Sequence, residues 1–281
     1  MKRIENMYVG FVVVAVLVAL MGTAQAALIA YEDFDYAAGK NFNVDPADGG
    51  TGWVGPWAST GVSGLTASGT VSSLYFGQSP DLIEDGSNHI WSESNKGNIR
   101  SFSQGVNVSS ETLYFTVLLR TYGGGNSTAQ MRAELRAGAA IRGTVGVDQG
   151  YLFAKADHPS GYGVGDVASE LFADDTTYLL AMKRTGESIF AALIEADGNI
   201  STLAAEPTWQ VQHDSATGVT FDTIRFLTNN VGGDGGIRLD ELRIATDWDS
   251  AVDGMIVPEP TALLFLGVGS LLTLRQKKRF H

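Results

Sequence analysis

Apolar and polar residues alternate over short stretches through most of this chain. The clearest stretch is Thr112–Arg120, in which every second residue from Leu113 to Leu119 is apolar. A period of two residues is typical of β-strands, since successive side chains leave opposite faces of a sheet. The residues between them are largely apolar too, so we expect a central strand that packs on both faces.

The same alternation predicts further strands, separated by short turns that are often rich in glycine. They are Met131–Arg136, Ala140–Val147, Tyr151–Ala156, Tyr178–Arg184, Ile189–Glu195, Val219–Leu227 and Ile237–Ala245. No stretch between residues 27 and 247 keeps the 3.6-residue period and the caps of a long helix. The prediction for residues 27–247 is therefore an all-β domain, an antiparallel β-sandwich or jelly roll.

Uninterrupted apolar runs replace this alternation at the two ends of the chain. Near the N-terminus, Lys2 and Arg3 precede the apolar run Val9–Gly22. Ala24 and Ala26 then form the small-x-small pattern of a signal-peptide cleavage site. We predict a signal helix within residues 1–26 that directs export and is removed before Ala27.

The C-terminal end has three parts: Pro258-Glu259-Pro260, the apolar run Thr261–Leu274, and a basic end. As a helix the run reaches roughly 21 Å, which is short of a ~30 Å hydrocarbon core but spans a thinned bilayer. We expect a short transmembrane helix with its basic end in the cytoplasm, and residues 248–257 as a tether before it. The two prolines keep Glu259 extended, a conformation that a processing enzyme can bind.

This tail, residues 258–281, resembles the PEP-CTERM sorting signal of Gram-negative bacteria. The resemblance implies that an exosortase-type enzyme recognises and processes the tail during export. It also implies transient membrane anchoring, followed by a place at the cell surface or in the extracellular matrix of a biofilm. Since it covers the tail alone, it implies nothing about what the body of the chain does.

The two ends of the body carry a second resemblance. Residues 31–39 (YEDFDYAAG), 49–57 (GGTGWVGPW) and 239–248 (LDELRIATDW) are similar to the opening and closing strands of concanavalin A-like, laminin-G-like domains. The resemblance implies a jelly roll in which the first and last strands pair. Many domains of this kind bind sugars, some of them through Ca²⁺.

Charge and cysteine content narrow the function classes. The chain has 19 Lys and Arg against 31 Asp and Glu, a net charge of −12, and no cysteine. Such an acidic chain does not bind nucleic acid or anionic lipid through general electrostatics. An exported chain without disulfides is held together by its core or by a metal ion.

Asp240-Glu241 is the candidate metal-binding pair. The apolar positions of the last predicted strand change phase across this pair, which predicts a β-bulge. A carboxylate turned inward there needs backbone N–H donors or a cation. Both alternatives stay open, since Ca²⁺ takes about six to eight oxygens and Asp33, Asp35 or Asp234 would have to supply more of them.

Arg132, Glu134 and Arg136 lie on one face of a predicted strand and are the candidate ligand face. The stretch Met131–Arg136 is similar to the Arg-x-Glu-Leu-Arg motif of jelly-roll alginate lyases, which implies a grip on polyuronate carboxylates. Gln212-His213 departs from that family's Gln-x-His, and its Tyr-x-Lys element is missing. The alternative is a row of ion pairs on a solvated strand face.

Other catalytic patterns are absent from the sequence, including the Gly-x-Ser-x-Gly elbow, the His-Glu-x-x-His zinc motif and the phosphate loop. We therefore expect an exported surface or matrix protein without enzymatic activity that binds polysaccharide. One alternative is a Ca²⁺-dependent adhesin or structural module. The other is a polysaccharide lyase or hydrolase that acts through Arg132, Glu134 and Arg136.

Overall fold

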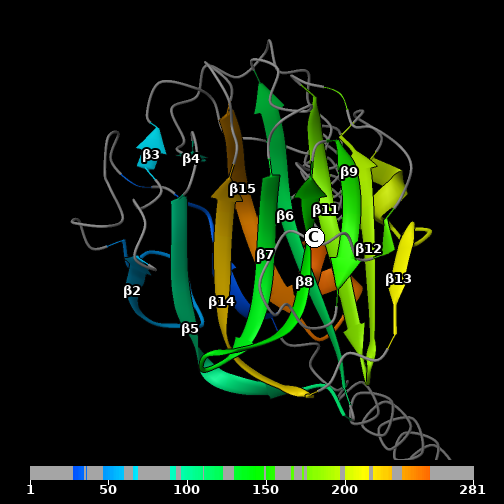
Figure 1. Ribbon diagram of the computed structural model, residues 1–281, viewed down its shortest axis with the longest axis horizontal. Coiled ribbons are helices and arrows are strands. Elements are labelled where there is room, and N and C mark those ends of the chain that lie inside the picture. Colours follow the sequence, from blue (N-terminus) through cyan, green and yellow to red (C-terminus); the bar gives the residue numbers. More distant parts are fainter. Residues whose placement is uncertain are drawn as a thin grey trace, which may run out of the picture.

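The computed structural model describes the body of the chain in segments. These are residues 28–34, 36, 47–59, 66–68, 89–92, 96–109, 111–122, 130–148, 150–155, 166–167, 173, 176–196, 200–214, 218–229 and 236–253. Within them, two antiparallel sheets pack face to face (Figure 1). The predicted signal helix with Ala24 and Ala26, and the tail with Pro258, Glu259 and Pro260, lie outside the described residues.

Sheet A contains eight of the described strands, in the order β13-β12-β11-β6-β15-β4-β3, with β1 also paired to β15. Their bounds are β1 (Leu28–Glu32), β3 (Thr66–Ser68), β4 (His89–Ser92), β6 (Thr112–Tyr122), β11 (Thr177–Thr185), β12 (Ser188–Glu195), β13 (Val211–His213) and β15 (Gly236–Ala245).

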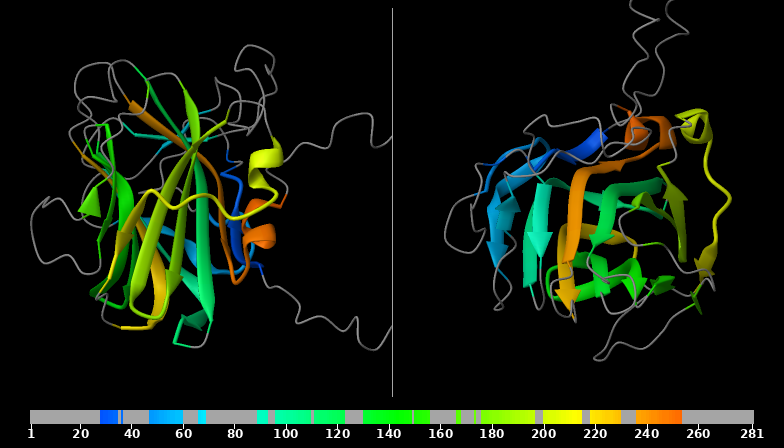
Figure 2. Two further views of the ribbon diagram at one scale, coloured as in Figure 1. Left: turned by 90° about the vertical axis from the view of Figure 1, so that its right-hand side faces the viewer. Right: turned by 90° about the horizontal axis from the view of Figure 1, so that it is seen from above.

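Sheet B contains seven of the described strands, in the order β10-β9-β8-β7-β14-β5-β2. Their bounds are β2 (Trp53–Ser59), β5 (Lys96–Asn107), β7 (Gln130–Ala137), β8 (Ala140–Asp148), β9 (Tyr151–Lys155), β10 (Asp166–Val167) and β14 (Thr220–Asn229). A short 3-10 helix, η1 (Ile200–Leu203), and a short α-helix, α3 (Trp248–Val252), lie against sheet A (Figure 2).

The strands predicted from alternation are all present, with ends that agree to within one or two residues. Strand β6 lies at the centre of sheet A, between β11 and β15. Its residues Leu113, Phe115, Val117 and Leu119 face the core between the sheets. Tyr114 and Leu118 face a smaller apolar cluster on the outer face of sheet A, so the prediction of packing on both faces is confirmed.

Strand β5 was not predicted, although it is one of the long strands of sheet B. The positions Asn98, Arg100 and Phe102 turn inward, and the first two are polar residues with 0% and 4% exposure. Arg100 pairs across the strands with Ile224, a core residue. Two buried polar residues on the inward face remove the alternation that marks a strand in the sequence.

The first and last strands pair, as the second resemblance implied. Glu32 of β1 lies opposite Leu242 of β15, and Leu28 lies opposite Ala245. Glu32 is fully buried and forms an ion pair with Arg100 of β5. The opening strand is thus joined to both sheets, by backbone pairing to sheet A and by a side chain to sheet B.

Of the predicted tether over residues 248–257, the structure describes residues 248–253. Trp248–Val252 form helix α3, and Trp248, Ala251 and Val252 are buried in the apolar cluster on sheet A. The three apolar side chains repeat at helical spacing, which lets one face of a single turn pack. No helix within the described residues is long and apolar enough to cross a membrane.

Candidate functional site

The outer face of sheet B carries a cluster of charged residues that we call the arginine face: Arg132, Glu134, Arg136 and Arg225. Strand β7 supplies the first three, because alternation turns them away from Met131, Ala133 and Leu135 in the core. Strand β14 supplies Arg225, which lies directly opposite Glu134 in the register. Direct cross-strand partners share a face, so all four side chains meet on one side of the sheet.

Glu134 lies at the centre of the arginine face and is fully buried. Arg225 donates from Nε to Oε2 at 2.8 Å and from Nη2 to Oε1 at 2.9 Å. Arg136 donates from Nη1 to Oε2 at 2.9 Å, and Nε of Arg132 lies 3.1 Å from Oε1. The two oxygens of one carboxylate therefore hold three guanidinium groups in place.

The arginine face carries a net charge of +2, because three cations surround one carboxylate. The arginine side chains keep partial exposure, 12% for Arg136, 18% for Arg132 and 19% for Arg225. A guanidinium fork that is fixed by one carboxylate can present its remaining N–H groups to a second one. Arg136 has fewer of them to present, because its Nη2 donates to the carbonyl of Ala139 at 2.6 Å and its Nε to that of Gly138 at 3.4 Å. The chain as a whole is strongly acidic, so this local positive charge stands out as an anion-binding feature.

Cross-strand pairing extends the arginine face toward the edge of sheet B. Thr144 lies opposite Glu134, and Lys155 lies opposite Thr144. Phe153 and Tyr151 follow on β9, and Tyr151 is 42% exposed. The extension adds a fourth cation and two aromatic rings, groups that suit an acidic sugar chain.

Sequence reasoning missed Arg225 and Lys155. Each belongs to a strand that was predicted, and Arg225 has the outward phase between Ile224 and Phe226. The sequence does not say that β14 lies beside β7, however, because residues 134 and 225 are far apart along the chain. Only the strand order brings the third arginine to Glu134.

Gln212 and His213 lie away from the arginine face. They belong to β13, the edge strand of sheet A, and His213 lies opposite Ile189 of β12. The partial similarity to the alginate lyase motifs therefore divides between the two sheets. Arg132, Glu134 and Arg136 come together, whereas the histidine does not join them.

The predicted bulge at Asp240-Glu241 is confirmed. The register between β15 and β6 shifts between Asp240 and Arg243, and Glu241 has a φ of 49°. Asp240 is 1% exposed, and its Oδ1 accepts a hydrogen bond of 2.9 Å from the backbone N of Glu241. The sequence left two partners open for an inward carboxylate, a backbone N–H donor or a cation. For Asp240 the structure shows a backbone N–H donor.

Glu241 lies between an aromatic hydroxyl and a cation. Tyr31 Oη donates to Oε1 at 3.2 Å, and Nη2 of Arg243 lies 3.5 Å from Oε2. Burial raises the pKa of Glu241, the nearby charge of Asp33 raises it further, and Arg243 and Tyr31 partly oppose this shift. The raised pKa reflects burial and does not by itself indicate a bound cation, which would lower it.

Within the part of the chain that the structure describes, no group of three or more His, Cys, Asp or Glu residues is placed to hold a metal ion. Asp33 is near enough to Glu241 for its negative charge to raise the pKa of Glu241. Asp35 and Asp234 lie outside the described residues. Calcium binding by Asp240 and Glu241 therefore stays a prediction.

No protein-family model and no curated protein matches this chain. Among solved structures, the carbohydrate-binding module CBM66 from Bacillus subtilis is 9% identical, with a TM-score of 0.41 over 67% of this chain and 94% of that chain. The alginate lyase from Corynebacterium sp. is 8% identical, with a TM-score of 0.39 over 56% and 75% of the two chains. The exoplasmic/lumenal domain of VIP36 in its Ca²⁺/Man-bound form is 9% identical, with a TM-score of 0.41 over 57% and 78%.

These distant similarities say nothing about what this chain binds or catalyses. The class that the strand order and the core define is an all-β sandwich of two antiparallel sheets.

Proposed function

We propose that this chain is an exported cell-surface or matrix protein that binds acidic polysaccharide through the arginine face. The observation that carries the proposal is the fixed, partly exposed cluster of Arg132, Arg136 and Arg225 around the buried Glu134. A carboxylate-bearing sugar offers the planar, bidentate partner that a guanidinium prefers. Export and surface location rest on the signal-peptide pattern and on the resemblance of the tail to PEP-CTERM signals.

The proposal is for binding without cleavage. Both oxygens of Glu134 already accept from arginines, which leaves this carboxylate poorly suited to act as a general base. His213, the nearest counterpart in sequence to a lyase histidine, belongs to the other sheet. These two features favour a ligand-binding face over the lyase and hydrolase alternatives.

The experiment measures binding of the purified protein to alginate and polygalacturonate as acidic probes and to dextran as a neutral probe. We expect binding to the acidic probes only, with an affinity that falls as salt is added. The variants Arg136→Ala and Arg225→Ala should each weaken binding at least about tenfold, since a charge-assisted pair contributes about 1.5–3 kcal/mol. Each variant leaves two arginines on Glu134, so the fold is expected to persist, which a thermal melt checks.

Lys183→Ala is the matched control, because it removes one positive charge from sheet A, where Lys183 pairs with Glu206. Its affinity for the acidic probes should equal that of the wild type. Equal binding to dextran, or equal loss in the control and in the two arginine variants, would contradict the proposal. Assays of the same samples for unsaturated or reducing ends, with Ca²⁺ and with chelator, test the lyase and calcium-dependent alternatives.

A further inference from the structure

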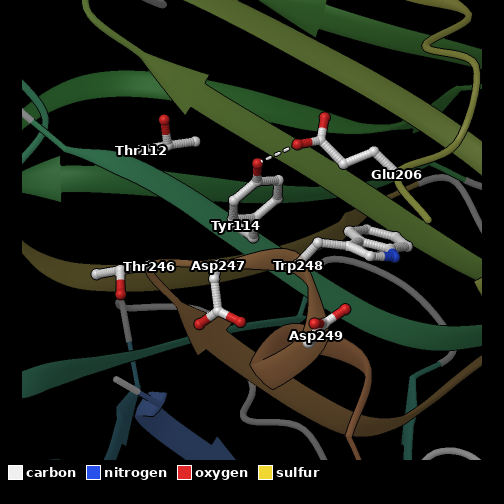
Figure 3. Close-up of a pocket in the computed structure, with 7 residues that line it drawn as sticks. All are labelled: Thr112, Tyr114, Glu206, Thr246, Asp247, Trp248 and Asp249. Carbon is white, nitrogen blue, oxygen red and sulfur yellow. Dashed lines mark hydrogen bonds between the residues drawn. The ribbon is translucent and has the colours of Figure 1, made fainter. Parts of the chain in front are cut away.

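A pocket lies on the outer face of sheet A and shares no residue with the arginine face. Its volume is about 350 Å³, and it forms where the start of β6 meets the turn into α3 and the segment after η1 (Figure 3). It is lined by Thr112, Tyr114, Glu206, Thr246, Asp247, Trp248 and Asp249. This volume lies within the range of small-molecule sites and accommodates one sugar ring.

The aromatic wall of the pocket is rigidly held. Tyr114 and Trp248 meet edge to face with ring centroids 6.0 Å apart, and Trp248 also contacts Trp209 at 6.3 Å. The indole Nε1 of Trp248 donates to the carbonyl of Leu203 at 2.8 Å. Trp248 is 5% exposed, so the wall is formed before any ligand arrives.

One side of this wall already binds an ammonium group of the protein itself. Lys183 Nζ lies 5.6 Å from the centroid of the Tyr114 ring and 2.7 Å from Oε2 of Glu206. Glu206 also accepts from Tyr114 Oη and, at 3.2 Å, from Trp209 Nε1. A carboxylate and an aromatic ring together are a combination that stabilises ammonium groups in proteins.

The other side of the wall has carboxylates without a lysine. Figure 3 shows Glu206 on one side of Tyr114 and Asp247 and Asp249 on the other. Oδ1 of Asp247 accepts from the backbone N of Ser250 at 2.9 Å, which caps α3. Its Oδ2 is withdrawn from solvent and has no hydrogen-bond donor among the described residues. A buried carboxylate oxygen without a donor is costly, and a ligand that brings a positive charge to this side offsets the cost.

We propose that this pocket binds an amino sugar, with the protonated amine between Asp247 and Asp249 and the sugar ring against the narrow exposed edges of Tyr114 and Trp248, which are 6% and 5% exposed. Three carboxylates line or edge the pocket against one lysine, so its charge favours a cation over a neutral sugar. The hydroxyls of Thr112 and Thr246 add partners for sugar hydroxyls. The proposal is independent of the arginine face, which would attract the opposite charge.

The test is calorimetric titration of the purified full-length protein with glucosamine, N-acetylglucosamine and glucose. We expect glucosamine to bind at least about tenfold more tightly than the other two, because acetylation removes the charge and glucose lacks the amine. Asp249→Asn should weaken glucosamine binding about tenfold. Asp247→Asn should do the same, and it keeps a side-chain oxygen that can cap α3.

Arg136→Ala is the control that separates the two proposals, since it should leave glucosamine binding unchanged whether or not acidic polysaccharide binds. Free lysine is a further probe, and it should bind more weakly than glucosamine if the ring is recognised. Equal affinity for the three sugars, equal affinity for lysine, or unchanged glucosamine affinity in Asp249→Asn would each overturn the proposal. Asp249 is exposed, so this last variant is expected to fold and gives a decisive result.

Discussion

Glu134 and Gly146 lie in strands that the sequence pattern identifies, but their surroundings come from neighbouring strands. Glu134 alternates with apolar residues and has the pattern of a solvated position, yet it is fully buried beneath three arginines. Gly146 lies opposite Arg132 on β8, where a Cβ would meet the carbonyl oxygen of Met131 at 2.0 Å. At the residue scale, the arginine face therefore depends on the close approach of β7 and β8.

Replacing Gly146 tests this close approach. Gly146→Ala should lower the free energy of unfolding by about 1–3 kcal/mol, because the added methyl group forces the β7 and β8 backbones apart. Urea unfolding measures the change. Gly105→Ala is the matched control, since its Cβ would meet only the Phe221 carbonyl at an ordinary 3.6 Å. Equal stability of the two variants would show that the β7 and β8 backbones are not in close contact at Gly146.

The segment from η1 to β13 is the element that completes the outer face of sheet A. Leu203 lies in the apolar cluster with Trp248, and Glu206 joins the segment to β6 through Tyr114 and to β11 through Lys183. Burial alone would raise the pKa of Glu206, but hydrogen bonds from Lys183, Tyr114 and Trp209 outweigh it and hold the pKa below its usual value. The ionised form of Glu206 is thus the one that fastens this segment.

The lowered pKa predicts a dependence of stability on pH. A carboxylate with a lowered pKa in the fold stabilises it above the ordinary value of 4.5, and this contribution is lost as the pH falls through the folded-state pKa. Glu206→Gln should therefore have a lower Tm than the wild type at about pH 7, and the difference should shrink as the pH falls below 4.5. Thermal melts over this range measure it, with Glu195→Gln at the exposed end of β12 as the control. A difference that does not change with pH would contradict the role of the ionised carboxylate.

At the scale of the whole molecule, Glu32 and Arg100 connect the two sheets. Glu32 ends β1 in sheet A, and Arg100 lies on the inward face of β5 in sheet B. Trp57 Nε1 and Tyr36 Oη each donate to Glu32 Oε2 at 3.0 Å, and the backbone N of Phe34 donates to Oε1 at 3.1 Å. The buried carboxylate is therefore fully satisfied and fixes the opening of the chain over the core.

Breaking this pair should destabilise the sandwich as a unit. Glu32→Leu should lower the free energy of unfolding by about 3–5 kcal/mol, because it leaves the Arg100 cation buried without its partner. The double variant Glu32→Leu with Arg100→Met should recover part of the loss, and urea unfolding of the four proteins gives the coupling energy. A single variant within about 1 kcal/mol of the wild type would mean that solvent replaces the missing partner.

The sequence was sufficient to predict the strands whose alternation is local, together with the bulge at Asp240-Glu241. These strands are β6, β7, β8, β9, β11, β12, β14 and β15. It was not sufficient for β5, because Asn98 and Arg100 on its inward face are buried polar residues, and the carboxylate that pairs with Arg100 comes from Glu32, far away in the chain. Nor did it predict α3, since a single turn has too few residues to establish a helical period.

The sequence by itself determined that the body of this chain is a β-sandwich, because a period of two residues is a property of each strand and needs no knowledge of its neighbours. It also indicated Arg132, Glu134 and Arg136 as a row on one strand face. Only the tertiary structure decided that Arg225 completes this row and that Tyr114, Glu206 and Asp247 line one pocket (Figure 3). Both outcomes depend on strand order and register, which arise from the packing of the whole core and are not encoded in any single stretch.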